Sequence, residues 1–253
     1  MKVIAVINSK GGVGKSTTVQ QLASFLGCCG RRVLCIDLDP QCNLSVSSGS
    51  DGKAVGDALS FIARDHKPKD CIEELKEFSL IAGSRGLSSA DSLFQGKGGE
   101  YALKNALEGL SYDYVVLDTP PALGHITINA LTASNYVVIP ANASLFSIQG
   151  VSQLWQTIQT VKEYCNPSLT VGGVLITKCK ARGKAAEQMS FQMEALTREM
   201  GTKVYKAKIR DSVIVEESQI RQCSLFSYAP KAKVSKDYED FCKEVLRDIE
   251  EER

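Results

Sequence analysis

Short runs of apolar, largely β-branched residues recur along the chain, and segments with helical periodicity separate them. The runs lie at Val3–Ile7, Val33–Ile36, Tyr114–Leu117, Tyr136–Ile139 and Val171–Ile176. Continuous apolar runs of this length predict strands that are buried on both faces. The segments between them include the amphipathic stretches Thr17–Leu26, Ala102–Leu110, Ile148–Tyr164 and Ala185–Met200. This alternation predicts an α/β fold, a doubly wound and mostly parallel sheet with helices on both faces.

Residues 45–99 have a less regular pattern, with pieces rich in glycine, serine and lysine. We expect helices and loops there that decorate the same domain. A chain of 253 residues is long enough for one sizeable core. With no internal repeat and no low-complexity tail in the sequence, residues 1–253 are predicted to form a single domain.

Composition narrows the setting in which the chain works. The formal net charge of +1 gives no overall attraction to nucleic acid or anionic membrane, so any such binding must come from a local patch. The nine cysteines are scattered, odd in number and free of C-x-x-C pairs, which favours reduced thiols over a disulfide scaffold. No stretch approaches the roughly 20 apolar residues that a membrane span needs. We therefore expect a soluble cytoplasmic protein.

A glycine-rich turn follows the first predicted strand and leads into a helix. Its sequence is Ser9-Lys10-Gly11-Gly12-Val13-Gly14-Lys15-Ser16. In this context, backbone N–H groups and the helix dipole point at phosphate oxygens, Lys15 supplies a charge to the outer phosphates, and the Ser16 hydroxyl suits Mg²⁺. Ser9 stands where the plain phosphate-loop pattern has its first glycine. A turn that merely links strand to helix is the alternative, and the Gly-Lys-Ser run argues against it.

Aspartates follow two of the predicted strands. Asp37 and Asp39 come after the second strand, and Asp118 closes the run Val115–Leu117. Ligands of open α/β folds gather at the carboxyl edge of the sheet, where these side chains are expected. Asp118 suits a carboxylate that holds Mg²⁺ through water. A strand-end cap is the alternative for Asp37 and Asp39, but the phosphate loop makes a Mg²⁺-ATP hydrolase the more economical explanation.

Three motifs together resemble the ParA/MinD family of P-loop ATPases, which has a deviant Walker A loop. They are KGGVGKST near the N-terminus, DLDPQCN at Asp37–Asn43 and VVLDTPP at Val115–Pro121. The resemblance spans nearly the whole chain and is greatest to the short, Soj-like ParA partition proteins, which lack an N-terminal helix-turn-helix domain. It implies that Lys10 is the signature lysine, which reaches across a dimer interface to the phosphates of ATP held by the partner chain.

The resemblance also assigns the remaining roles around ATP and Mg²⁺. Asp39 would position or activate the attacking water, and Asp37 would lie beneath the site. The implied catalytic residues are Lys10, Lys15 and Asp39, and the implied metal residues are Ser16 and Asp118. The implied phosphate-side contacts to ATP are Lys10, Gly11, Gly12, Val13, Gly14, Lys15, Ser16 and Thr17.

The adenine segment departs from the family pattern. Relatives usually have Pro-Arg-Asn after a late strand, and Ile209-Arg210-Asp211 occupies that place here. By resemblance, Ile209 would pack beside the base and Asp211 would accept a hydrogen bond from its amino group.

Basic residues concentrate late in the chain, where a stripe of them would neutralise DNA phosphates without reading bases. Ordinary solvated surface is the alternative for half or more of them. Because Soj-like ParA dimers bind nonspecific DNA through this part of the chain, the predicted DNA contacts are Arg182, Lys206, Arg210, Arg221, Lys231 and Lys233.

The C-terminal segment distinguishes this interpretation from its nearest rival, a MinD-like, membrane-cycling regulator of the division site. Tyr238, Phe241, Val245 and Ile249 recur at helical spacing, which would also suit an amphipathic membrane helix. Acidic residues outnumber basic ones on the polar face, whereas a membrane-surface helix should be rich in Lys and Arg. We expect this helix to pack its apolar face on the domain, with no stable membrane association.

The sequence thus predicts a ParA-type ATPase for chromosome or plasmid segregation, located in the bacterial cytoplasm and on the nucleoid. ATP would close a homodimer that binds nonspecific DNA, and a ParB-like partner would stimulate slow hydrolysis and release. A metal-cluster carrier is disfavoured because no cysteine lies near Asp118. A ligase-type biosynthetic enzyme with the same loop would need a second-substrate pocket that the sequence does not identify.

Overall fold

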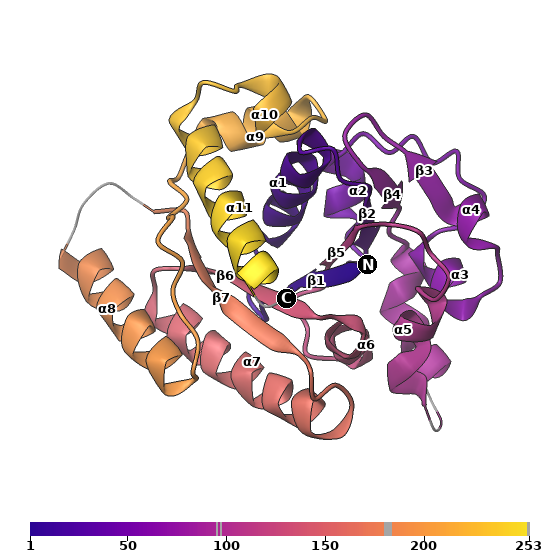
Figure 1. Ribbon diagram of the computed structural model, residues 1–253, viewed down its shortest axis with the longest axis horizontal. Helices are drawn as coiled ribbons and strands as arrows, with labels where there is room; N and C mark the ends of the chain where they lie inside the picture. Colours follow the sequence, from indigo (N-terminus) through magenta and orange to yellow (C-terminus); the bar gives the residue numbers. More distant parts are fainter. Residues whose placement is uncertain (95, 97, 180–183, 252–253) are drawn as a thin grey trace.

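One sheet runs through the centre of the computed structural model, which describes residues 1–94, 96, 98–179 and 184–251. In these residues the sheet has seven strands in the order β3-β4-β2-β5-β1-β6-β7 (Figure 1). Neighbouring strands are parallel except for the antiparallel pair β3 and β4 at one edge. The strands are β1 (Lys2–Val6), β2 (Val33–Asp37), β3 (Ile72–Glu74), β4 (Ser79–Ile81), β5 (Tyr114–Asp118), β6 (Tyr136–Asn142) and β7 (Thr170–Thr177). The predicted α/β fold class is confirmed.

Helices cover both faces of the sheet (Figure 1). One face carries α1 (Lys15–Cys28), α2 (Asn43–Ser47), α9 (Val213–Ile220), α10 (Leu225–Tyr228) and α11 (Lys233–Glu251). The other carries α3 (Ala58–Ala63), α4 (Pro68–Cys71), α5 (Ala102–Ala106), α6 (His125–Ala133), α7 (Leu145–Tyr164) and α8 (Lys184–Glu199), with the 3₁₀ segments η1 (Arg85–Phe94) and η2 (Gly99–Tyr101).

Two hydrophobic cores lie on the two faces of the sheet. In β1, Val3 and Ala5 belong to the core beneath α6 and α7, whereas Ile4 and Val6 belong to the core beneath α1 and α11. Successive side chains of a strand point to opposite faces, so a strand covered on both sides must be apolar at every position. This is why the buried strands have continuous apolar sequences.

The structure departs from the pattern-based prediction in residues 45–99 and in the helix at Ala102–Leu110. The hairpin of β3 and β4 extends the sheet there, although β3 has the sequence Ile-Glu-Glu and is only partly buried. A short, half-exposed edge strand needs no apolar run and so leaves little signal. The helix α5 ends at Ala106, while Leu107 continues its buried face from a turn.

The C-terminal helix α11 packs its apolar face against α1. Val234, Tyr238, Phe241, Val245 and Ile249 are all buried there. The packing predicted for this helix is therefore confirmed, and the apolar face that a lipid surface would require is already covered by protein. Among the described residues, no helix combines the length and apolarity needed to cross a bilayer. All nine cysteines are free thiols.

Candidate nucleotide site

The turn between β1 and α1 has the geometry of a phosphate cradle. Gly12 and Gly14 have φ of 72° and 85°, the left-handed region in which a side chain is strained. Gly14 is the residue before α1 and lacks any side-chain cap, so the first N–H groups of the helix are left for a ligand. A glycine turn here therefore brings backbone donors to an anion at the carboxyl edge of the sheet.

Lys15 is the first residue of α1 and is largely buried. Its Nζ donates to the carbonyl oxygen of Lys10 across the loop, at 3.3 Å. Burial lowers the pKa of Lys15, while the nearby carboxylates of Asp118 and Asp39 act in the opposite direction. A buried ammonium with one weak backbone acceptor gains strongly when phosphate oxygens approach it.

The Lys10 side chain lies against the end of β6 and the N-cap of α7, outside the cavity that most of the loop lines. Its Nζ donates to Asn142 Oδ1 at 3.3 Å and to Ser144 Oγ at 3.2 Å, at the end of β6 and the N-cap of α7. Gly11, Gly12, Gly14, Lys15, Ser16 and Thr17 line the cavity among the described residues, and Lys10 and Val13 are not in that lining. The lysine ammonium is thus beside its own phosphate loop without entering it.

Asp39 lines the cavity at the end of β2, and Asp37 lies beneath it. Asp39 Oδ1 accepts a hydrogen bond from the Gln41 N–H at 2.9 Å, and no described residue donates a hydrogen bond to its second oxygen. Asp37 Oδ2 accepts from the N–H and the hydroxyl of Ser45 at 2.9 and 2.7 Å. Burial raises the pKa of Asp37, and its hydrogen bonds to Ser45 oppose that rise. Asp37 is therefore a structural anchor, whereas Asp39 faces the ligand space.

Asp118 is fully buried at the end of β5, opposite Asp37 in the register of the sheet. Neither of its carboxylate oxygens accepts a hydrogen bond of normal geometry from a described residue, although the Ser16 hydroxyl is close enough to act on its pKa. Burial first, and then the charge of Asp37, raises the pKa of Asp118 well above its ordinary value, while Ser16 and Lys15 oppose the rise. A carboxylate without partners beside a serine hydroxyl fits a hydrated Mg²⁺, which supplies the missing positive charge.

Replacing Asp118 with asparagine should stabilise the protein in Mg²⁺-free, nucleotide-free buffer. Because folding raises the pKa of this carboxyl, the folded state must bind a proton or keep a buried charge at pH 7, and the amide avoids that cost. We expect a gain in the free energy of unfolding at pH 7, which vanishes below the pKa of an unfolded aspartate and grows as the pH rises toward the raised pKa of the folded carboxyl. Urea unfolding at several pH values measures this, and the same variant should lose the Mg²⁺ dependence of nucleotide binding. A variant less stable than wild type at pH 7 would contradict this account of Asp118.

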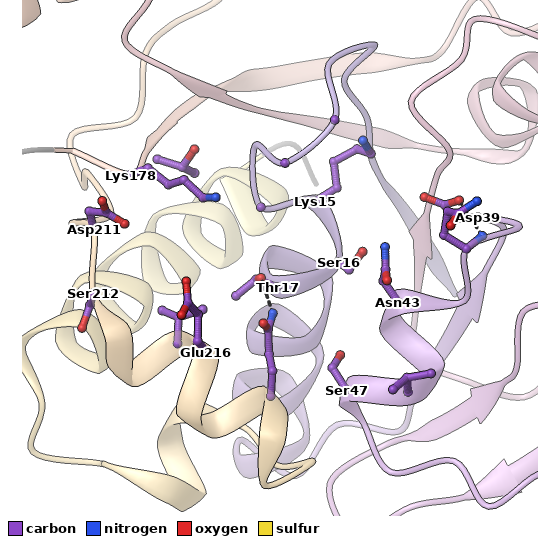
Figure 2. A pocket seen from close by; sticks show the side chains of 18 of the residues that line it. Lys15, Ser16, Thr17, Asp39, Asn43, Ser47, Lys178, Asp211, Ser212 and Glu216 are labelled. Carbon is purple, nitrogen blue, oxygen red and sulfur yellow. Dashed lines mark hydrogen bonds between the residues drawn. The ribbon is translucent and has the colours of Figure 1, made fainter.

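The cavity has a volume of about 770 Å³, which is within the range of cofactor sites. Figure 2 shows Lys178, Asp211, Ser212 and Glu216 on one side of the helix that carries Lys15, Ser16 and Thr17, with Asp39, Asn43 and Ser47 on the other. An adenine base bound by Asp211 as predicted would lie against the first side, which we call the base wall, and Asp39 on the second side would then face the outer phosphates.

The two residues predicted to contact adenine have different positions. Asp211 lines the cavity and is exposed, as a base acceptor requires. Ile209 is 3% exposed, belongs to the core beneath α11 and is not in the lining. The expected packing of Ile209 beside the base therefore needs correction: its backbone pairs with β7 through Ile176, which turns its side chain into the core.

The predicted DNA contacts fall into three groups. Arg182 lies outside the described residues. The side chains of Lys206, Arg221, Lys231 and Lys233 are exposed and form no salt bridge with the described part of the chain. Arg210 differs, because it lines the cavity and its guanidinium pairs with Asp237 at 2.6 Å. The helix α10 contacts both α9 and α11, and these helices lie together at one end of the molecule (Figure 1).

Several lining residues were not predicted from the sequence. Gln219 of α9 donates to Thr17 Oγ1 at 3.0 Å and so joins α9 to the phosphate helix. Ser212, Val215, Glu216 and Gln219 all line the cavity. Their spacing matches one face of a helix, a signal visible in the sequence although nothing in it says which ligand that face meets. Asn43, the last residue of the DLDPQCN motif, lines the same side of the cavity as Asp39.

Comparison with known proteins gives consistent relatives. A family model described as AAA domain matches residues 1–171. Soj of Bacillus subtilis, a sporulation initiation inhibitor protein, is 36% identical over 96% of this chain and 98% of its own length. The chromosome-partitioning ATPase Soj of Thermus thermophilus is 32% identical over 98% and 96%. A crystal structure of cobyrinic acid a,c-diamide synthase from Mycobacterium smegmatis with bound ADP and magnesium has a TM-score of 0.85 and 30% identity, and the match covers 100% of this chain and 97% of that one.

Proposed function

Because the chain belongs to the ParA/MinD family of P-loop ATPases, we propose that it is a DNA-partition ATPase, in which ATP drives dimerisation and nonspecific DNA binding. The relatives support ATP hydrolysis with Mg²⁺ as the chemistry, and chromosome partition as the process. A bacterial cytoplasmic location on the nucleoid follows from the same proposal, as does a ParB-like protein that stimulates hydrolysis.

The observation that carries the dimer is the direction of Lys10. Its ammonium lies on Asn142 and Ser144, outside the cavity of its own chain. Two weak neutral acceptors at the positive end of α7 hold a cation poorly, so an anionic group brought by a second chain would displace them. This supports a role for Lys10 at the phosphates of a partner chain.

The chain's own residues divide the work on ATP. The phosphate loop and Lys15 bind the outer phosphates, and Ser16 and Asp118 would hold Mg²⁺, which supplies charge neutralisation for the transferred phosphoryl group. Asp39 faces the same space and orients or deprotonates the attacking water. Phosphoryl transfer depends mainly on alignment and charge, so closure by a second chain that adds Lys10 would complete the site.

The function is tested by DNA binding to the purified chain with ATP, with ADP and without nucleotide. We expect tight binding to DNA of unrelated sequences with ATP alone, because only the closed dimer doubles the basic surface. Equal binding in the three conditions would refute the switch. Sedimentation with anionic liposomes in ATP tests the MinD-like alternative, which the buried apolar face of α11 disfavours.

Replacing Arg221 with alanine should weaken DNA binding about equally for all sequences and lower the salt slope by roughly one. Arg221 is exposed and has no salt bridge within the described residues, so its charge is available to a phosphate. Salt titrations of DNA affinity measure the slope. Lys69→Ala in α4, away from α9–α11 in Figure 1, is the matched control and should have no effect. Unchanged DNA affinity in the Arg221 variant would remove this residue from the DNA surface.

A biosynthetic ligase is the second candidate, because the cobyrinic acid a,c-diamide synthase matches over nearly its whole length. Such an enzyme needs a carboxylate substrate next to the outer phosphates of ATP. ATP hydrolysis that responds to DNA and not to a corrinoid carboxylate would support partition over ligation.

A further inference from the structure

Three acidic residues on one face of α11 bind the backbone and side chains of residues 203–210. Asp248 accepts from Lys203 Nζ at 2.6 Å, and Glu244 accepts from the N–H groups of Lys206 and Ala207 at 3.0 and 2.9 Å. Asp237 accepts from Arg210 three times: from its N–H at 3.1 Å and from Nε and Nη2 at 2.6 Å each. The acidic face of α11 therefore holds residues 203–210 in place, and this segment leads to the base wall of the nucleotide cavity.

Of these three contacts, the one made by Asp237 reaches the cavity itself. Arg210, Asp211 and Ser212 line it, whereas Lys203, Lys206 and Ala207 are not in the described lining. The residue after Asp237, Tyr238, also lines the cavity, and its hydroxyl lies 3.9 Å from where a Cβ on Gly14 would be. One turn of α11 thus borders both the base wall and the phosphate loop.

The ion pair of Asp237 with Arg210 is stronger than an ordinary surface pair. The Asp237 side chain is 12% exposed, whereas that of Arg210 is 45% exposed, so the carboxylate is the more buried partner of the pair. Two parallel N–H···O bonds fix the plane of the guanidinium, and the third bond fixes the backbone of the same residue. The direction of the chain into Asp211 and Ser212 follows from these bonds.

We propose that Asp237 is a positioning residue for nucleotide binding, which acts through Arg210 to hold the base wall against the phosphate loop. This rests on the nucleotide site of the proposed function, and it gives Arg210 a role at the nucleotide in place of one at DNA. The carboxylate touches no part of the nucleotide. Its loss lets Arg210 change rotamer and lets the backbone at Asp211 move, which weakens base binding in every nucleotide state.

The test is equilibrium binding of Mg²⁺-ADP to the full chain, which needs neither dimer nor DNA. Asp237→Asn should raise the Kd for ADP about fivefold to tenfold, the effect of losing one or two charge-assisted hydrogen bonds. The KM for ATP should rise similarly, with kcat at saturating ATP unchanged within about twofold. Arg210→Ala should give the same increase, and the double variant should be no worse than either single one, because both remove one interaction.

Glu244→Gln is the matched control, since it loosens the same helix and segment away from the cavity and should leave the Kd for ADP unchanged. An equal loss in Glu244→Gln would mean that general loosening of α11 is responsible and would overturn the proposal. Additive losses in the double variant, or an unchanged Kd in Asp237→Asn, would overturn it as well. If Arg210→Ala binds ADP with normal affinity but loses DNA binding at saturating ATP, then Arg210 contacts DNA and the proposal is overturned. If the wild-type chain does not bind DNA, the proposed function in DNA partition is refuted. The ADP-binding test of Asp237 still applies in that case, because it needs no DNA.

Discussion

Replacing Lys10 with alanine should abolish ATP-dependent dimerisation while the monomer still binds ATP. In the structure, the Lys10 ammonium contacts Asn142 and Ser144 and lies outside its own cavity, so its removal takes no contact from the nucleotide bound by the same chain. We expect a Kd for ADP within about threefold of wild type and a dimerisation affinity weakened on the order of 100-fold or more, the effect of deleting one partner of a desolvated charge pair. Analytical ultracentrifugation with ATP measures the dimer, and DNA binding should disappear with it.

Lys15→Ala is the matched comparison, because Lys15 is in the same loop but inside the cavity. This variant should bind ADP and ATP poorly even as a monomer. If Lys10→Ala lost nucleotide affinity to the same extent as Lys15→Ala, then Lys10 would act on its own chain and the role across the dimer would be wrong.

Replacing Asp39 with alanine should trap the ATP-bound dimer. Asp39 lines the cavity but takes no part in the phosphate loop, so ATP affinity should be preserved while water is no longer oriented. We expect kcat to fall about 10²-fold to 10⁴-fold, the range for loss of a positioned general base. The dimer, seen by size-exclusion chromatography with ATP, should then accumulate and remain on DNA.

Asp39→Asn distinguishes a loss of catalysis from a disturbance of the loop. The amide oxygen of asparagine can still accept the hydrogen bond from the Gln41 N–H, so the loop should keep its structure. Both variants should lose hydrolysis and keep the dimer. A chain that stays monomeric with ATP when Asp39 is alanine would assign this residue to dimer assembly, and a wild-type kcat would remove it from catalysis.

Local sequence was sufficient for five of the seven described strands and for the phosphate loop. The runs at β1, β2, β5, β6 and β7 are apolar at nearly every position because helices cover both faces of the sheet. The loop was recognisable because Gly12 and Gly14 need left-handed backbone and Lys15 must follow them directly. The aspartates at the ends of β2 and β5 followed from the parallel sheet, which places carboxyl ends side by side: Asp37 is opposite Asp118 in the register.

Long-range contacts were beyond prediction from sequence patterns. The core position of Ile209 depends on its pairing with Ile176 of β7, and the state of Arg210 depends on Asp237, which lies on another element. From the sequence, the excess of acidic residues on the polar face of α11 indicated only that this helix is unsuited to a membrane surface. The structure uses Asp237, Glu244 and Asp248 as acceptors for residues 203–210.

The sequence by itself therefore determined the fold class and the phosphate loop, because each depends on local backbone geometry or on periodic burial. Tertiary structure alone decided where the charged side chains point. It turned Lys10 toward Asn142 and Ser144, left Asp118 buried without a hydrogen-bond partner among the described residues, and paired Arg210 with Asp237. Charged groups are placed by whichever partners the fold brings within hydrogen-bond distance, and those partners are far away along the chain.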